Sequence, residues 1–157
     1  MALCLVGSEM CIRDSTEVMY SPQSNGFDYE WVEFYNPNDI AIFVNSWTIA
    51  DNEQKDNIVS EENEIITIPA KSVGILTSSP STFRETYVNY KYVFSVEDVA
   101  IGNGLGTSET IILSKNSYND AFTYTSEDGA NGNGKTLTRS CCNCANWSEA
   151  VSSPGTI

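Results

Sequence analysis

Two glutamates lie three residues apart in the aromatic-rich segment YEWVEFYN, residues 29–36. Paired carboxyl groups are the usual machinery of glycoside hydrolysis, so Glu30 and Glu33 are the first candidates for catalysis. The segment has the composition of a strand, however, and strand residues three apart point to opposite faces. We therefore expect one carboxylate to be solvated and the other to be hydrogen-bonded. Glu30 shares a face with Val32 and Phe34, so it is the one expected to bond a neighbouring turn.

A second group of carboxylates, Asp51, Glu53 and Asp56, crowds one loop. Calcium takes oxygen ligands from loops of this kind. The spacing does not match an EF-hand, because Lys55 stands at the fifth position from Asp51 and the glycine of the sixth position is absent. These residues are therefore interpreted as a solvated loop, with a calcium site as the alternative. No other metal or cofactor is predicted.

Two glycine-rich stretches, GNGLG at 102–106 and NGNG at 131–134, suggest phosphate binding at first sight. Neither follows the Gly-x-x-x-x-Gly-Lys-Ser/Thr pattern, and no strand–helix unit surrounds them. We predict that they are turns whose glycines adopt positive φ.

Three cysteines, Cys141, Cys142 and Cys144, lie in the segment SCCNCANW. Three thiols form a zinc site only if another chain supplies a fourth ligand. In an oxidising compartment a Cys141–Cys144 disulfide is favoured instead, which leaves Cys142 as an odd thiol. Asn146 follows directly and begins an Asn-Trp-Ser glycosylation sequon.

The chain has no histidine, which excludes Ser-His-Asp and Cys-His catalysis and histidine-ligated metals. Its 157 residues carry a formal net charge of −13. Such a surface repels phosphate backbones and anionic lipids, so neither nucleic acid nor a membrane surface is expected as a partner. The chemistry that remains open to an enzyme of this composition is that of carboxylate pairs, Ser-Lys pairs and metal sites with oxygen ligands.

The candidate residues sit in a chain of short β-type segments separated by Gly, Pro, Asn and Asp. No stretch shows sustained helical periodicity, although residues 78–90 have room for a short helix. The pattern predicts an all-β fold, a sandwich or a barrel. The expected strands cover residues 16–20, 29–36, 40–44, 46–51, 64–69, 72–77, 91–96, 107–116, 118–126 and, as the last, 135–140.

Alternation along these strands assigns one side chain in two to the core. Trp147, beyond the last expected strand, is interpreted as a plug that closes the core. The predicted core residues are Val18, Val32, Phe34, Ile42, Val44, Trp47, Ile49, Ile66, Ile68, Val73, Ile75, Ile111, Leu113, Phe122, Tyr124 and Leu137.

Several segments, in this order, resemble the lamin tail domain family. The most specific is EWVEFYN at 30–36, which is similar to that family's acidic residue, Trp, aliphatic, Glu, apolar, aromatic, Asn motif. The other matching segments are TEVMYSP at 16–22, NSWTIAD at 45–51, GLGTSETIILSKN at 104–116, YNDAFTYTS at 118–126, NGNGKTLTR at 131–139 and NWSEAVSSPGT at 146–156. The resemblance implies an immunoglobulin-like β-sandwich. It also implies a non-catalytic interaction module of the kind found in secreted and surface proteins of bacteria and archaea.

The first residues resemble something other than a protein. The segment CLVGSEMCIRDS at 4–15 is similar to the translation of a transposase-type sequencing adapter, which it matches without a mismatch from Leu5 to Asp14. The resemblance implies that residues 1–15, including Cys4 and Cys11, are adapter-derived and that the domain spans residues 16–157. A signal peptide would then be lost from this sequence.

Together these observations predict an interaction or adhesion module of a larger secreted or cell-surface protein. Its partner would be another protein or a surface polymer, and neighbouring domains would flank it. Two alternatives remain: an accessory domain of a truncated secreted nuclease or hydrolase, and a calcium-stabilised structural module.

Overall fold

The computed structural model describes residues 15–24, 26–61, 67–88, 90–116, 118–139 and 146–156. The five cysteines, the predicted core residue Ile66 and nearly all of the adapter-like segment lie outside these ranges. The Cys141–Cys144 disulfide therefore stays a prediction.

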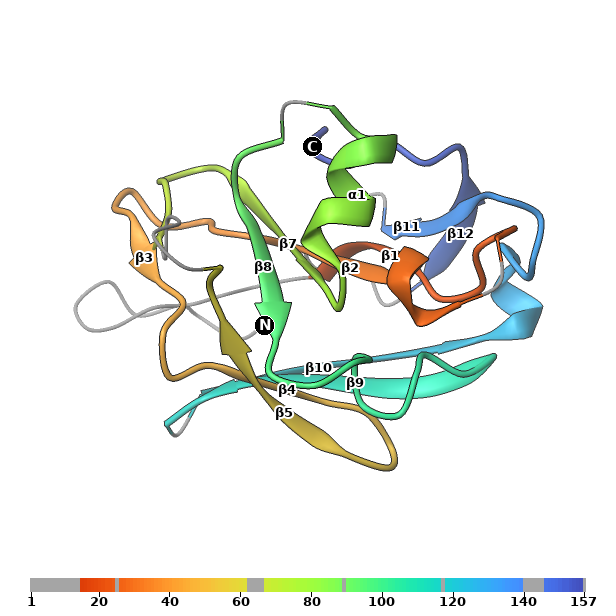
Figure 1. Ribbon diagram of the computed structural model, residues 1–157, viewed down its shortest axis with the longest axis horizontal. Coiled ribbons are helices and arrows are strands. Elements are labelled where there is room, and N and C mark those ends of the chain that lie inside the picture. Colours follow the sequence, from red (N-terminus) through yellow and green to blue (C-terminus); the bar gives the residue numbers. More distant parts are fainter. Residues whose placement is uncertain are drawn as a thin grey trace.

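Twelve strands, one α-helix and two 3₁₀ turns make up the described fold, so the predicted all-β class is confirmed (Figure 1). The strands are β1 (Ser15–Met19), β2 (Trp31–Tyr35), β3 (Ile42–Phe43), β4 (Thr48–Ala50), β5 (Lys55–Val59), β6 (Thr67–Ile68), β7 (Val73–Thr77), β8 (Val93–Val96), β9 (Ser108–Lys115), β10 (Tyr118–Thr125), β11 (Thr136–Arg139) and β12 (Trp147–Ala150). The helical elements are η1 (Phe27–Tyr29), α1 (Pro80–Thr86) and η2 (Ser126–Asp128).

Ten strands form one sheet in the order β10-β9-β4-β5-β8-β7-β2-β1-β11-β12, and β3 and β6 form a separate pair. All neighbours are antiparallel except β7 and β8. Figure 1 shows the first four strands below and the other six above, joined where β5 pairs with β8. The sheet is thus curled nearly into a barrel around its core.

Side chains from the two halves of the sheet meet in this core. The Tyr20 and Tyr124 ring centroids lie 4.7 Å apart, and those of Phe34 and Trp47 lie 6.5 Å apart. Every predicted core residue that the structure describes is buried. Trp147 is buried as well and packs on Phe122 at 5.3 Å, so its expected role as a core plug is confirmed.

The end of the chain differs from the prediction, which made 135–140 the last strand. A further strand, β12, pairs antiparallel with β11, with Trp147 opposite Arg139. The sequence signal was weak because β12 has only four residues and just one of them, Trp147, is buried. At the other end, β1 begins at Ser15, one residue before the predicted boundary of the domain.

A second, smaller core lies on the outer face of the upper half. Met19, Trp31, Ile75, Phe83 and Val93 are its buried members. Phe83 comes from α1, which covers this face of the sheet (Figure 1). Ile75 is thus buried as predicted, but beneath the helix and not between the two halves of the sheet.

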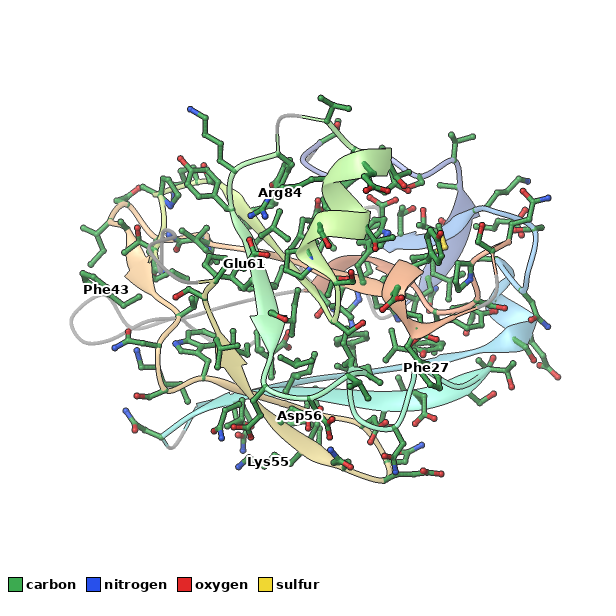
Figure 2. The ribbon with its side chains drawn as sticks, viewed as in Figure 1. Phe27, Phe43, Lys55, Asp56, Glu61 and Arg84 are labelled. Carbon is green, nitrogen blue, oxygen red and sulfur yellow. The ribbon has the colours of Figure 1, made fainter. Side chains whose placement is uncertain are left out.

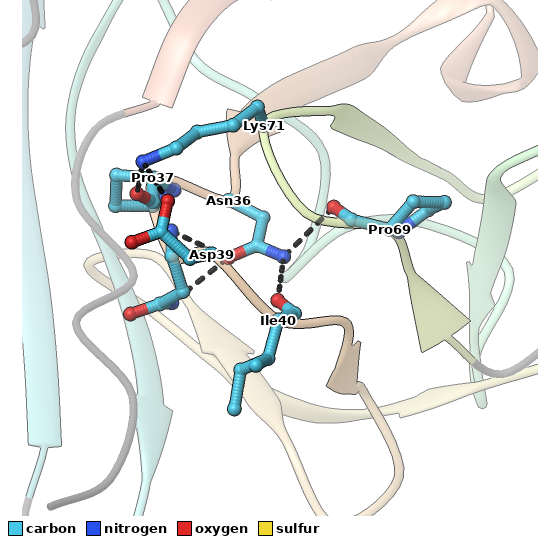
Figure 3. Close-up of polar contacts among 7 residues, drawn as sticks. Asn36, Pro37, Asp39, Ile40, Pro69 and Lys71 are labelled. Atoms are coloured by element: carbon cyan, nitrogen blue, oxygen red, sulfur yellow. Dashed lines mark hydrogen bonds and ion pairs between the residues drawn. The ribbon is translucent and has the colours of Figure 1, made fainter.

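Asn36, at the end of β2, fixes the turn that leads to β3 (Figure 3). Its side-chain amide donates to the carbonyls of Ile40 at 2.9 Å, Ile68 at 3.1 Å and Pro69 at 2.8 Å. Its side-chain oxygen accepts the backbone N–H of Asn38 at 3.0 Å. A buried amide with its hydrogen-bonding capacity used in this way holds β3 and β6 at the end of the barrel.

Candidate functional site

Glu30 is buried and accepts the backbone N–H of Leu105 at 2.8 Å. Burial raises the pKa of its carboxyl to about 7, and the Leu105 N–H offsets part of that rise. The Tyr124 hydroxyl donates to the Gly106 carbonyl of the same turn at 3.0 Å. The hydrogen bond to a neighbouring turn that was predicted for Glu30 is therefore confirmed, and it joins β2 to the loop between β8 and β9.

Glu33 points to the opposite face, as the alternation predicts, but it is not solvated. It is buried, and it accepts the Thr16 hydroxyl and the backbone N–H of Gly155 at 2.6 Å. The prediction of one solvated carboxylate is wrong because residues 151–156 lie over this face, and local alternation carries no information about that segment.

Glu17 stands directly opposite Glu33 on β1 and is buried as well. It accepts the Thr136 hydroxyl and the backbone N–H of Ser153 at 2.9 Å. Burial raises the pKa of both carboxyls, that of Glu33 to about 7, and the charge of Glu17 adds to the shift on Glu33. The two glutamates thus form a clamp for the C-terminal segment, in which both oxygens of Glu33 and the Oε1 of Glu17 accept hydrogen bonds from the protein.

The acidic loop is also built into the fold. Asp51 accepts the backbone N–H groups of Glu53 and Gln54, both at 2.7 Å, and that of Asn103 at 3.2 Å. Asp56 accepts the Gly102 N–H at 2.7 Å. Gly102 and Gly104 have φ of 58° and 104°, which confirms the predicted turn geometry of this stretch.

Glu53 adds one more hydrogen bond to this loop, from the Asn103 side-chain amide at 3.1 Å. The carboxylates of Asp51, Glu53 and Asp56 therefore tie two loops together. Within the described ranges, no group of three or more Asp, Glu, Cys or His side chains is arranged to hold a metal ion.

A recess between η1, α1 and the loop that follows β1 is a stronger candidate for binding. Its volume is about 190 Å³. We call it the aromatic recess, and its lining residues are Met19, Gln23, Ser24, Asp28, Tyr29, Trp31, Thr82, Phe83, Thr86, Tyr87 and Gly134. These come from four separate stretches of the chain.

Three of its rings are locked against one another. The Trp31 ring meets Phe83 edge to face at 5.7 Å and Tyr87 at 5.8 Å, and Phe83 and Tyr87 are 4.8 Å apart. The Tyr87 hydroxyl is bonded to that of Ser152 at 2.6 Å. The wall of the recess is therefore already in place in the folded chain.

The rim of the aromatic recess is polar and negative. Asp28 is exposed, and Tyr29 beside it keeps 40% of its surface exposed. Figure 2 shows Arg84 of α1 beside Glu61, with which it forms an ion pair. Lys135, next to Gly134 in the chain, pairs with Glu149 at 2.5 Å. No residue in the described part of the chain forms an ion pair with Asp28.

A second recess, of about 330 Å³, lies where the clamped segment meets β7. It is lined by Lys71, Ser72, Val73, Tyr90, Lys91, Tyr92 and Gly155. The Lys71 ammonium is engaged by the Pro37 carbonyl and by Asp39 at 3.1 Å (Figure 3). Tyr90 in this lining packs against Phe83 with ring centroids 6.2 Å apart, and its hydroxyl donates to the Val73 carbonyl at 3.1 Å.

Sequence reasoning missed the aromatic recess because its residues are far apart in the chain. The available signal was the run Phe27-Asp28-Tyr29, two aromatic residues around a carboxylate, of which both rings remain well exposed in the structure. Asn146, the predicted glycosylation residue, is exposed.

Comparisons with family models, curated proteins and solved structures find no match to this chain. None of the helices among the described residues is long and apolar enough to cross a membrane.

Proposed function

We propose that this chain is a non-catalytic binding module of a secreted or cell-surface protein, built as a lamin-tail-like, immunoglobulin-type sandwich. The observation that carries the proposal is the aromatic recess, a concave site with a rigid ring wall and a polar rim. A concave, partly apolar site with a few polar groups is the default place to look for binding on a folded domain.

The use of the carboxylates supports a binding role over a catalytic one. Glu30 and Glu33 lie on opposite faces of the sheet and each accepts backbone N–H groups of a covering segment. A catalytic carboxyl pair instead has to converge on one substrate bond. We propose a protein or a surface polymer as the partner and neighbouring domains in the full-length protein.

The test compares two tryptophan substitutions on α1. Thr86→Trp fills the recess, whereas Ser81→Trp places the same ring on an exposed position of the helix that does not line it. Both variants and the parent chain are assayed by biolayer interferometry against purified cell-wall polysaccharides and a set of acidic and basic proteins.

The proposal expects saturable binding to one member of the set, lost in T86W and kept in S81W. The proposal would be overturned if the parent chain showed saturable binding to no member of the set. It would also be overturned if T86W bound as tightly as the parent chain. Circular dichroism of both variants checks that the fold is retained.

A further inference from the structure

We propose that the aromatic recess takes the ammonium group of a lysine side chain from a partner protein. The inference rests on the proposed function for the place of the site and adds the chemistry of its occupant. Its observations are the charge of the rim, the ring wall and the size of the recess.

The charge at the rim of the recess favours a cationic occupant. Asp28 lines the recess, and the ion pairs among the described residues use Arg84 and Lys135 elsewhere. The carboxylate therefore keeps its charge available at the rim. The chain as a whole carries a formal charge of −13, so its field draws cationic partners toward the surface and speeds their approach.

The aromatic rings of the recess also favour a cation. A cation over an aromatic face is attracted by the negative charge of the ring face, more strongly where water is excluded. The rings that a ligand can reach are the half-buried Tyr87 and Tyr29 at the mouth, which keeps 40% of its surface exposed, while Trp31 and Phe83 lie buried behind them. The same apolar wall can pack the methylene stem of lysine, whose charged head then stays at the polar rim.

The size of the recess and the acceptors among its lining residues favour lysine over other cations. A volume of about 190 Å³ is below the roughly 300–1,000 Å³ of sites for drug-sized ligands, so the recess admits one side chain. Gln23, Ser24 and Asp28 are among the lining residues, and their side-chain oxygens are of the type that accepts from the three N–H donors of an ammonium group. A quaternary ammonium has no such donors and a guanidinium is larger and planar.

The experiment uses the full chain, labelled with ¹⁵N, and follows its amide resonances during titration. The ligands are an acetyl-Gly-Lys-Gly-amide peptide, the same peptide acetylated on the lysine Nζ, its arginine counterpart, and free butylammonium. We expect saturable shifts at 26–29 and 81–87 with the lysine peptide and none with the acetylated one.

Two matched substitutions localise the charge. Asp28→Asn removes the rim carboxylate, and Glu85→Gln removes a carboxylate from an exposed α1 position that does not line the recess. Loss of a charged hydrogen bond should weaken binding of the lysine peptide about tenfold in D28N, while E85Q should change it less than about twofold. Equal weakening by both variants would show general attraction and overturn the proposal.

Other outcomes also decide the matter. Equal shifts from the acetylated peptide would rule out ammonium recognition, and tighter binding of butylammonium or of the arginine peptide would rule out a partner lysine. If no ammonium ligand binds while T86W still abolishes binding to a polysaccharide, the lysine assignment fails and the proposed function stands. If neither effect occurs, both fail.

Discussion

The two faces of β2 are buried in different ways. On the inner face Val32 and Phe34 are covered by the other half of the same sheet. On the outer face Trp31 is covered by α1, and Glu33 by the C-terminal segment. The inner cover belongs to the sheet itself, whereas the outer cover consists of two separate segments laid on it. The comparison teaches that the outer face can carry a binding recess because its cover leaves a gap.

The largest expected effect is at the centre of the inner face. Phe34→Ala leaves a cavity between Trp47 and Phe94, whose rings lie 6.5 Å and 6.4 Å away. We expect a loss of about 3–5 kcal/mol in the free energy of unfolding, measured by urea denaturation. Phe83→Ala on the outer face should cost about 3 kcal/mol, the low end of the same range, and should open residues 78–90 to proteolysis, which F34A would not do selectively. Equal, global effects of both would remove the distinction between the faces.

The pH dependence reports on both faces together. Glu30 and Glu33 each have a pKa raised to about 7 by burial, so each binds its proton more tightly in the folded chain than in the unfolded chain. Their contribution to stability is fully present below about pH 4.5 and is lost as pH rises through 7, on the order of 2 kcal/mol for each carboxyl. The urea midpoint should therefore be higher at pH 5 than at pH 8.

Glutamine substitutions separate the two contributions. Glu30→Gln and Glu33→Gln should each flatten part of the pH dependence, measured from urea midpoints at four pH values, and the raised pKa of Glu17 should leave a remainder in both variants. A parent chain that is equally stable at pH 8 and pH 5 would contradict the burial of these carboxyls. Glu149 acts in the opposite direction, because bonds from Lys135, Ala130 and Asn133 lower its pKa to about 2 and its contribution is lost in acid.

Substitution of two glycines compares the loops that are held on the two faces. Gly102 has φ of 58° and Gly155 has φ of 89°, and a Cβ would meet the Asp51 carboxylate at the first and the Tyr90 ring at the second. We expect Gly102→Ala to lower the free energy of unfolding by about 2–3 kcal/mol. Gly155→Ala should cost about 1 kcal/mol, because the C-terminal segment can lift locally. Thermal denaturation of the two variants checks the order, and a larger cost for G155A would reverse the comparison.

Calcium should have the smallest effect. The oxygens of Asp51 and Asp56 already accept backbone N–H groups, so a bound ion would have to displace those bonds. We expect calcium at about 1 mM to shift the melting temperature by less than about 1 °C. A clear calcium-dependent rise would favour the calcium-stabilised alternative.

The inner face could be predicted from the sequence because alternation is a local signal. A spacing of two residues places Val32 and Phe34 on one face of their strand, and it does the same for Ile111 and Leu113. All four side chains are buried as expected. The hydrogen bond of Glu30 could be predicted for the same reason, since its neighbours on that face are core residues.

The outer face could not be predicted in this way. Burial of Glu33 depends on Gly155, which lies 122 residues further along the chain. The aromatic recess depends on the docking of α1, a helix too short to show a periodic pattern. Long-range contacts of this kind leave no trace in the local sequence.

The central claim is that the buried carboxylates serve the fold and the aromatic recess serves binding. The most direct measurement is the amide-shift titration of the full chain with the lysine peptide. The account predicts saturable shifts confined to residues around Asp28, Tyr29 and α1, with none at residues 51–56 or 101–106. Saturable shifts in the acidic loop, with the recess unchanged, would contradict it.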